Sequence, residues 1–202
     1  MKRYIDILIA SVAITVGAPV MLAIAAAVKF TSRGSVLYWS DRVGRDNQIF
    51  RMPKFRTMRT DTPELPTHLL TDSDRWITPL GRILRSTSLD ELPQLWSVLI
   101  GQMSLVGPRP SLFNQHDLIR LRSLSGVHRL TPGVTGWAQI NGRDELEIDV
   151  KVRFDEDYVN LQSAAFDVKV IALTAFKVLR RDGIHQADAT SAETAGPRQE
   201  AA

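Results

Sequence analysis

The feature that most restricts the fold is an apolar segment near the N-terminus, residues 7–28, which contains 22 residues and no charged side chain. About 20 apolar residues are enough for a helix to cross the hydrocarbon core of a bilayer. The segment therefore has the length of a membrane helix, and it is longer than the apolar core of a signal peptide. We expect the rest of the chain to fold beside a membrane.

Two details of this segment favour a helix that enters and leaves the membrane on the same side. Pro19 lies near its middle, where it removes a helical hydrogen bond and bends or breaks the helix. Both flanks are basic, so the positive-inside rule gives no preferred orientation. These flanking cations are Lys2, Arg3, Lys29 and Arg33. We expect a helix-break-helix that dips into one leaflet and returns, and a bent spanning helix is the alternative.

Composition narrows the classes of site and partner. The chain has no cysteine, which excludes disulfides and thiolate metal sites, and its four histidines lack the spacing of zinc ligands. A formal net charge of +3 and a pI near 9.4 suit an anionic partner such as a membrane surface, a nucleotide or nucleic acid. At 202 residues the chain can bury one good core.

Short β-prone runs follow the apolar segment. Residues 36–39 and 49–52 flank a turn at residues 44–47, which predicts a hairpin. Residues 42–59 contain six basic side chains and one acid, and most of this charge is expected in solvent or on lipid headgroups. The run Pro53-Lys54-Phe55-Arg56 differs because apolar residues alternate with cations. This alternation predicts that one cation points inward.

Most of the remaining chain has helical patterns. Residues 61–74 indicate a loop, and Thr78 should cap a short helix with Pro79 at its first position. Further helices are expected over residues 112–124, 144–161 and 166–179, the last of them amphipathic and packed on the core or lying on the membrane. The fold class we expect is α/β: a small, mostly helical domain with a short β-hairpin, built on the membrane-dipping helix.

The strongest candidate for chemistry is the segment of residues 84–110, LRSTSLDELPQLWSVLIGQMSLVGPRP. It holds the adjacent carboxylates Asp90 and Glu91, with Arg85 before them and Arg109 between two prolines. Cations hold anionic oxygens, and a carboxylate can attack phosphorus or bind a metal ion. The combination therefore suits phosphate chemistry.

A structural interpretation of the same acids is also open. Ser88 to Glu91 matches the S-x-x-E capping box, whereas Pro93 fits the first turn of a helix only if Asp90 is the cap. In both cases Asp90 would lie at a helix N-terminus, where the helix dipole favours its ionised form. Local pattern alone thus allows either a capped helix or a nucleophile.

Taken together, these segments resemble the bacterial sugar transferase family, the monotopic polyprenyl-phosphate phosphoglycosyl transferases. The resemblance covers about residues 4–181 and rests on the proline-containing apolar segment and three further stretches in the same order. These are RVGRDNQIFRMPKFRTM (42–58), RSTSLDELPQLWSVLIGQMSLVGPRP (85–110) and TPGVTGWAQINGR (131–143). Many members have Ser-Pro at the helix break, where this chain has Ala18-Pro19.

The resemblance implies transfer of a sugar-1-phosphate from a UDP-sugar to undecaprenyl phosphate, with release of UMP and the start of a bacterial glycan. Asp90 would be the nucleophile, forming a phosphosugar-aspartyl intermediate, and Glu91 would be its catalytic partner. Mg²⁺ would be coordinated near Asp90. Lys54, Arg85 and Arg109 match positions thought to hold phosphates or support the acid pair. Two residues of the glycine-rich stretch, Asn141 and Arg143, are either ligand-binding or structural.

The resemblance also implies an arrangement at the bacterial cytoplasmic membrane. Residues 1–33 would form the membrane-inserted re-entrant helix, residues 34–183 a catalytic domain on the cytoplasmic face, and residues 184–202 a disordered tail. Its partners would be the UDP-sugar, undecaprenyl phosphate and membrane lipid, and not nucleic acid, because no recognised binding module accompanies the basic stretch. The alternatives are a non-enzymatic, membrane-anchored adaptor that binds anionic lipid and a Mg²⁺-dependent phosphohydrolase that uses Asp90.

Overall fold

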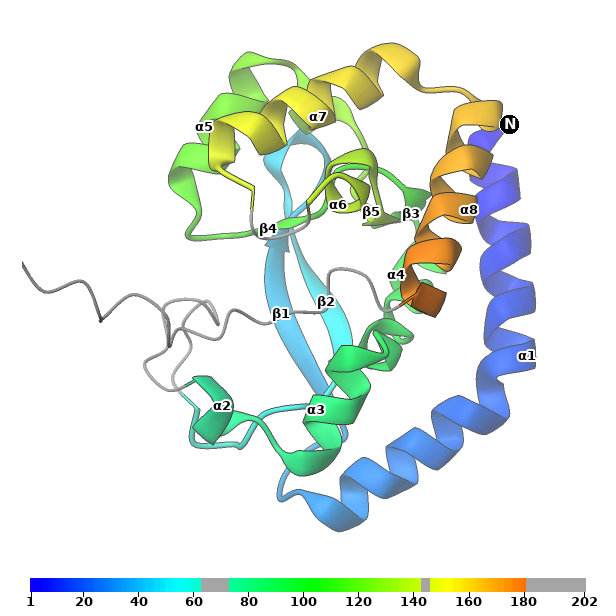
Figure 1. Ribbon diagram of the computed structural model, residues 1–202, viewed down its shortest axis with the longest axis vertical. Coiled ribbons are helices and arrows are strands. Elements are labelled where there is room, and N and C mark those ends of the chain that lie inside the picture. Colours follow the sequence, from blue (N-terminus) through cyan, green and yellow to red (C-terminus); the bar gives the residue numbers. More distant parts are fainter. Residues whose placement is uncertain (63–72, 143–145, 181–202) are drawn as a thin grey trace, which may run out of the picture.

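A β-hairpin runs through the middle of the molecule, and a long N-terminal helix lies along one side of it (Figure 1). The structure is a computed structural model that describes residues 1–62, 73–142 and 146–180; the predicted tail and most of the predicted loop at 61–74 lie outside these ranges. Helices α5 to α7 gather at one end of the hairpin, and α2 and α3 at the other. The helices after the first are α2 (Ser73–Trp76), α3 (Pro79–Ser86), α4 (Gln94–Ile100), α5 (His116–Leu124), α6 (Trp137–Ile140), α7 (Ile148–Leu161) and α8 (Ala164–Arg180).

The hairpin is confirmed. Strands β1 (Leu37–Val43) and β2 (Ile49–Phe55) pair antiparallel from Leu37 opposite Phe55 to Val43 opposite Ile49. Asp46 and Asn47 in the turn have φ of 53° and 59°, a left-handed conformation that Asp and Asn tolerate better than most residues. Strand β4 (Ser111–Leu112) adds to β1, while β3 (Ser104–Val106) and β5 (Gly133–Thr135) form a separate parallel pair.

Two predicted helices begin later than expected, and one predicted cap is confirmed. Residues 111–112 pair with β1, so α5 begins only at His116. Helix α7 begins at Ile148, and residues 144–145 lie outside the described ranges. Thr78 accepts a hydrogen bond of 2.9 Å from the Gly81 N–H and precedes Pro79, as predicted for α3. Helix α8 packs one face on the core through the fully buried Val170.

Helix α1 (Lys2–Thr31) is a single helix with Pro19 inside it. Figure 1 shows that it changes direction partway along its length, as expected for a helix that contains proline. The helix continues through all of residues 2–31, so it bends without dividing into two separate helices. By length and composition α1 could cross a membrane, with a mean hydropathy of 2.4.

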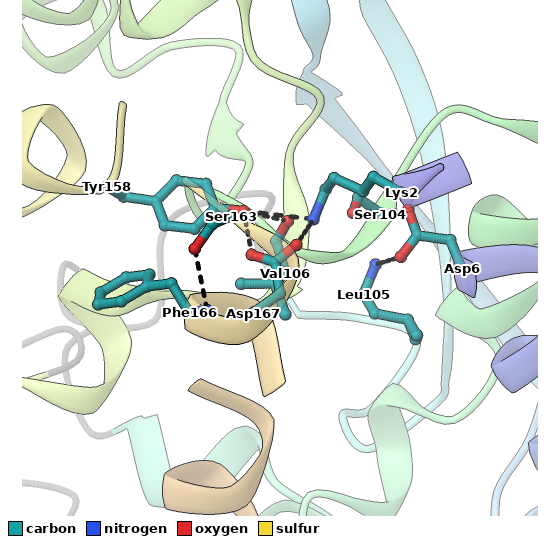
Figure 2. Close-up of polar contacts among 9 residues, drawn as sticks. All are labelled: Lys2, Asp6, Ser104, Leu105, Val106, Tyr158, Ser163, Phe166 and Asp167. Carbon is teal, nitrogen blue, oxygen red and sulfur yellow. Dashed lines mark hydrogen bonds and ion pairs between the residues drawn. The ribbon is translucent and has the colours of Figure 1, made fainter. Parts of the chain in front are cut away.

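The first turn of α1 is bonded into the body of the protein (Figure 2). Asp6 is 5% exposed and accepts hydrogen bonds from the Ser104 hydroxyl (2.8 Å) and the Leu105 N–H (3.2 Å), both on β3. The Lys2 ammonium lies 2.5 Å from a carboxylate oxygen of Asp167 on α8. A buried carboxylate is costly without such partners. This end of α1 is therefore part of the interior of the domain.

Arg3 is the third residue near this end of α1 that contacts the rest of the protein. Its guanidinium donates to the carbonyls of Val98 (2.5 Å) and Leu99 (2.6 Å), in the last turn of α4. A cation at the C-terminal end of a helix binds carbonyls of its last turn and complements the helix dipole. Lys2 and Arg3, read from the sequence as flanking cations of a membrane segment, thus bind protein groups.

The other end of α1 contacts the same body. Ile24 and Val28 pack in a buried cluster with Phe55 of β2 and Leu84 of α3. Beyond the helix, Arg56 donates to the Ser35 carbonyl (2.8 Å). Both ends of the apolar helix are therefore attached to one folded unit, while many side chains between them are exposed. Large exposed apolar residues of α1 include Leu8, Val12, Val16, Val20, Leu22 and Phe30.

Candidate active site

The acid pair lies in a tight turn between α3 and α4. Asp90 and Glu91 belong to a 3₁₀ turn, η3 (Leu89–Glu91), which follows Ser88 in a left-handed conformation with φ of 56°. Ser88 makes no capping hydrogen bond through its side chain, and α4 begins only after Pro93. Both capping interpretations are therefore wrong, and so is the argument that the dipole of a helix beginning at Asp90 ionises it.

Glu91 is fixed by two cations. Its Oε1 accepts from the Lys54 ammonium (2.7 Å) and from the Arg109 guanidinium (3.1 Å). Burial alone would raise the pKa of Glu91, but the charges and hydrogen bonds of Lys54 and Arg109 outweigh it and hold that pKa far below its usual range. The prediction of one inward-pointing cation is confirmed, and it is Lys54, whose own pKa burial lowers.

Asp90 has a different environment. It is 7% exposed, and in the described parts of the chain no side chain or N–H group forms a hydrogen bond with its carboxylate. Burial raises the pKa of Asp90, against the opposing influence of Lys54, Arg85 and Arg109. Two neighbouring carboxylates thus have opposite shifts, a pattern typical of sites that give each acid a separate role. Glu91 is held by Lys54 and Arg109, whereas Asp90 is buried near the same cations without being bonded to them.

Arg85 reaches the site from α3. Its Nε donates to the Thr57 hydroxyl (3.0 Å), and its charge lowers the pKa of Asp90. The Thr57 carbonyl accepts in turn from the N–H of Thr78, the cap of α3 (2.9 Å). The segment after β2 therefore fixes both the start of α3 and the side chain of Arg85. Sequence reasoning missed Thr57, and no local pattern in the sequence marked it.

Arg42 is a second residue that sequence reasoning missed. It was grouped with the solvent-exposed arginines, but it lies on β1, donates to Ser40 (3.0 Å) and to the Pro110 carbonyl (3.2 Å), and its charge acts on Lys54. Its partner across the β1–β2 pair is Phe50, whose side chain is buried. Because side chains alternate between the two faces of a strand, a residue opposite a buried one is expected on the same, inward face, and this was the available signal for Arg42. Two other arginines of the stretch are largely exposed, as predicted: Arg45 and Arg59.

The glycine-rich stretch packs closely against the backbone of residues 107–108. The Gly107 N–H donates to the Thr135 carbonyl and the Gly133 N–H to the Pro108 carbonyl, both at 2.9 Å. A Cβ atom on Gly136 would lie 2.1 Å from the Gly107 oxygen, and one on Gly133 would lie 2.1 Å from the Gly107 nitrogen. Only glycine permits this approach. These glycines therefore support the loop that carries Arg109.

The glycine-rich stretch contains two candidate ligand-binding residues, Asn141 and Arg143. Asn141 is the C-cap of α6, is exposed, and donates through its side-chain amide to the carbonyl of Trp137, the first residue of that helix (2.8 Å). This contact supports a structural role. Arg143 lies outside the described residues.

The charges at the site suit an anionic ligand. The buried Asp90 and the half-buried Glu91 lie near the cationic groups of Lys54, Arg85, Arg109 and Arg42. Within the described ranges no three His, Asp or Glu side chains gather as metal ligands. Mg²⁺ usually binds through one or two carboxylates plus substrate phosphates, and Asp90 fits that role because Glu91 is already occupied by two cations.

Comparison with known proteins matches the chain to one protein family. A model described as "Bacterial sugar transferase" matches residues 1–181. The chain is 40% identical over 185 residues to a UDP-glucose:undecaprenyl-phosphate glucose-1-phosphate transferase of Escherichia coli, covering 88% of this chain and 40% of the relative. It is 35% identical to a UDP-N-acetylgalactosamine-undecaprenyl-phosphate N-acetylgalactosaminephosphotransferase of Aeromonas hydrophila, covering 89% and 43%.

A shorter relative matches along nearly its whole length. This is an uncharacterized sugar transferase, EpsL, of Bacillus subtilis, which is 38% identical over 193 residues and covers 96% of this chain and 94% of the relative. The chain thus spans about two fifths of the longer curated relatives and almost all of this one.

Proposed function

Because the chain belongs to the bacterial sugar transferase family, we propose that it transfers a sugar-1-phosphate from a UDP-sugar to undecaprenyl phosphate, releasing UMP and starting a bacterial glycan. The observation that carries this proposal is the difference between the environments of Asp90 and Glu91. Asp90 is buried beside three cations with no hydrogen-bonding partner among the described residues, while Glu91 is held by Lys54 and Arg109. Such an arrangement suits covalent catalysis at phosphorus.

In the proposed mechanism the Asp90 carboxylate attacks the phosphorus that bears the sugar. The bond from this phosphorus to the oxygen of UMP breaks, giving a phosphosugar-aspartyl enzyme and UMP. A phosphate oxygen of the lipid then attacks the same phosphorus and releases Asp90. Lys54, Arg85 and Arg109 stabilise the charge on the phosphate oxygens. Bound Mg²⁺, held by Asp90 and the diphosphate, would supply further neutralisation of the leaving group.

The membrane arrangement we propose is a re-entrant α1 with the domain on the cytoplasmic face. Supporting this, Lys2 at one end of α1 and Val28 at the other contact one folded unit, and a helix spanning the bilayer would separate those contacts. The polyprenyl tail of the acceptor stays in the bilayer, so the site must lie at its surface. We expect a cysteine placed at the exposed Tyr4 to be unreactive towards an impermeant thiol reagent in intact cells and reactive in inverted vesicles. Reaction in intact cells would contradict the re-entrant arrangement.

The reaction is tested by UMP release from a panel of UDP-sugars with undecaprenyl phosphate and Mg²⁺. We expect release with at least one sugar, together with a lipid-linked sugar diphosphate detected by mass spectrometry. Free sugar-1-phosphate without lipid product would indicate a phosphohydrolase. Lipid binding without turnover of any UDP-sugar would indicate an adaptor and refute the proposed transfer.

The pH dependence of UMP release should reflect the raised pKa of Asp90. Attack requires the carboxylate, so the rate should fall as the pH is lowered through the pKa of Asp90, with a midpoint above the usual 3.8 because burial raises it. Arg85 lowers this pKa, so Arg85→Gln should move the midpoint to higher pH. Arg82→Gln, an exposed position on the same helix, should leave it in place. An unchanged midpoint in Arg85→Gln would exclude this electrostatic role.

A further inference from the structure

Arg109 lies between two prolines, which restricts how its backbone can be held. Pro108 and Pro110 have no N–H group, so the segment must be fixed largely through its carbonyls. All three carbonyls accept hydrogen bonds from distant parts of the chain. The donors are the Gly133 N–H to Pro108 (2.9 Å), the Arg122 guanidinium to Arg109 (2.8 Å) and the Arg42 guanidinium to Pro110 (3.2 Å).

The donor to Arg109 is itself held in place. Arg122 on α5 is 7% exposed, and its Nε (2.9 Å) and Nη2 (2.6 Å) both donate to one oxygen of Asp155 on α7, which is 1% exposed. This leaves Nη1 directed at the Arg109 carbonyl. A planar guanidinium fixed at two nitrogens has its third nitrogen fixed as well. Asp155 therefore determines where that third nitrogen points.

From these contacts we infer that Arg122, oriented by Asp155, is a positioning residue that sets the place of Arg109 in the active site. The path is short: Asp155 holds Arg122, Arg122 holds the Arg109 backbone, and the Arg109 side chain contacts Glu91 at 3.1 Å. Displacing the backbone of Arg109 would move the cation that faces the substrate phosphates. This inference rests on the proposed function only for its effect on rate.

A buried ion pair between α5 and α7 could also serve stability alone, and the two roles predict different results. Removing one partner of such a pair leaves an unpaired buried charge and destabilises the fold, so single substitutions do not distinguish them. Replacing both partners with apolar residues of similar size removes the charges together, and such replacements are often neutral for stability. The variant that separates the roles is therefore Arg122→Met with Asp155→Leu.

We expect this double variant to unfold at a temperature close to that of the wild type and to release UMP with a kcat/KM lower by about tenfold or more, because small displacements of a catalytic group are costly. In an Arg109→Ala background the same two changes should alter kcat/KM by less than about twofold, since the group they position is gone. An equal fall in both backgrounds, or no fall in either, would overturn the inference.

A second variant and a matched control distinguish a loss of positioning from a loss of folding. Arg122→Lys keeps a positive charge beside Asp155 but loses the planar guanidinium that donates to both Asp155 and the Arg109 carbonyl. It should therefore also lower kcat/KM, and this effect should also disappear in the Arg109→Ala background. Arg59 donates to Asp61 through two nitrogens at 3.1 Å in an exposed loop. Arg59→Lys is therefore the corresponding change at a pair away from the Arg109 backbone, and it should leave kcat/KM unchanged.

A readout without turnover separates this inference from the proposed function. Phenylglyoxal modifies accessible arginines, and mass spectrometry of the full chain in nanodiscs gives the rate at each site. The rate at Arg109 relative to the exposed Arg45 should rise severalfold in Arg122→Met/Asp155→Leu, and an unchanged ratio would refute the positioning role. If the wild type releases no UMP from any UDP-sugar, the proposed function fails, but this ratio still decides the inference.

Discussion

Asp90→Asn should reduce UMP release by at least about 10³-fold while leaving the protein folded, because a carboxamide of the same shape cannot act as the nucleophile. Its effect on stability should be neutral or favourable. Burial raises the pKa of Asp90, which means that the ionised form destabilises the folded state at neutral pH, and a neutral amide removes that penalty. The measurements are UMP release under single-turnover conditions and the unfolding temperature in the same detergent or nanodisc.

The control for this variant is Asp157→Asn, an exposed acid on α7 that should retain wild-type rate and stability. A rate for Asp90→Asn within a few-fold of the wild type would remove Asp90 as the nucleophile. A large loss of stability in the same variant would show that its carboxylate is a structural group of the turn.

Glu91→Gln should have the second largest effect, and it should lower both activity and stability. The amide leaves Lys54 and Arg109 close together without the anion that both contact, so we expect a loss of about 2 kcal/mol in the free energy of unfolding. Misplacing two phosphate-binding cations should also lower the rate by about 10²-fold. Equilibrium denaturation and UMP release measure the two effects.

The pH dependence of stability gives an independent check on Glu91. Its pKa in the folded protein lies below its unfolded value of 4.5, so its stabilisation is complete above pH 4.5 and is lost as the pH falls towards the folded pKa. The difference in stability between wild type and Glu91→Gln should therefore narrow in acid. The double variant Glu91→Gln/Lys54→Met should recover stability but not activity, and recovery of both would contradict the proposed roles.

Sequence alone predicted the features that depend on neighbouring residues. The hairpin, the Thr78 cap and one inward-pointing cation in residues 53–56 follow from turn residues, a proline after a threonine and apolar residues between cations. The structure identifies that cation as Lys54. Asp90 and Glu91 were identified by their spacing from Arg85 and Arg109, and the structure brings all of these with Lys54 into one place.

The errors concern side chains whose partners are distant in the sequence. The capping box at Ser88 was a valid local pattern, but Glu91 gains more from Lys54 and Arg109 than a single backbone N–H offers. Arg42 looked like surface charge because its acceptor, the Pro110 carbonyl, lies 68 positions away. The alternation along β1 can indicate that Arg42 points inward, but no local periodicity identifies the distant group that it contacts.

The first turn of α1 has a consequence for biogenesis. Lys2 leaves the ribosome long before Asp167, which lies 165 positions later, and the contact of Asp6 can form only after Ser104, 98 positions later, has been synthesised. During synthesis the apolar helix can meet lipid long before these partners exist, so insertion should precede docking of the domain. Nascent chains arrested before Asp167 should therefore be membrane-bound but protease-sensitive, and completion of α8 should be the step that closes the fold onto its own first turn.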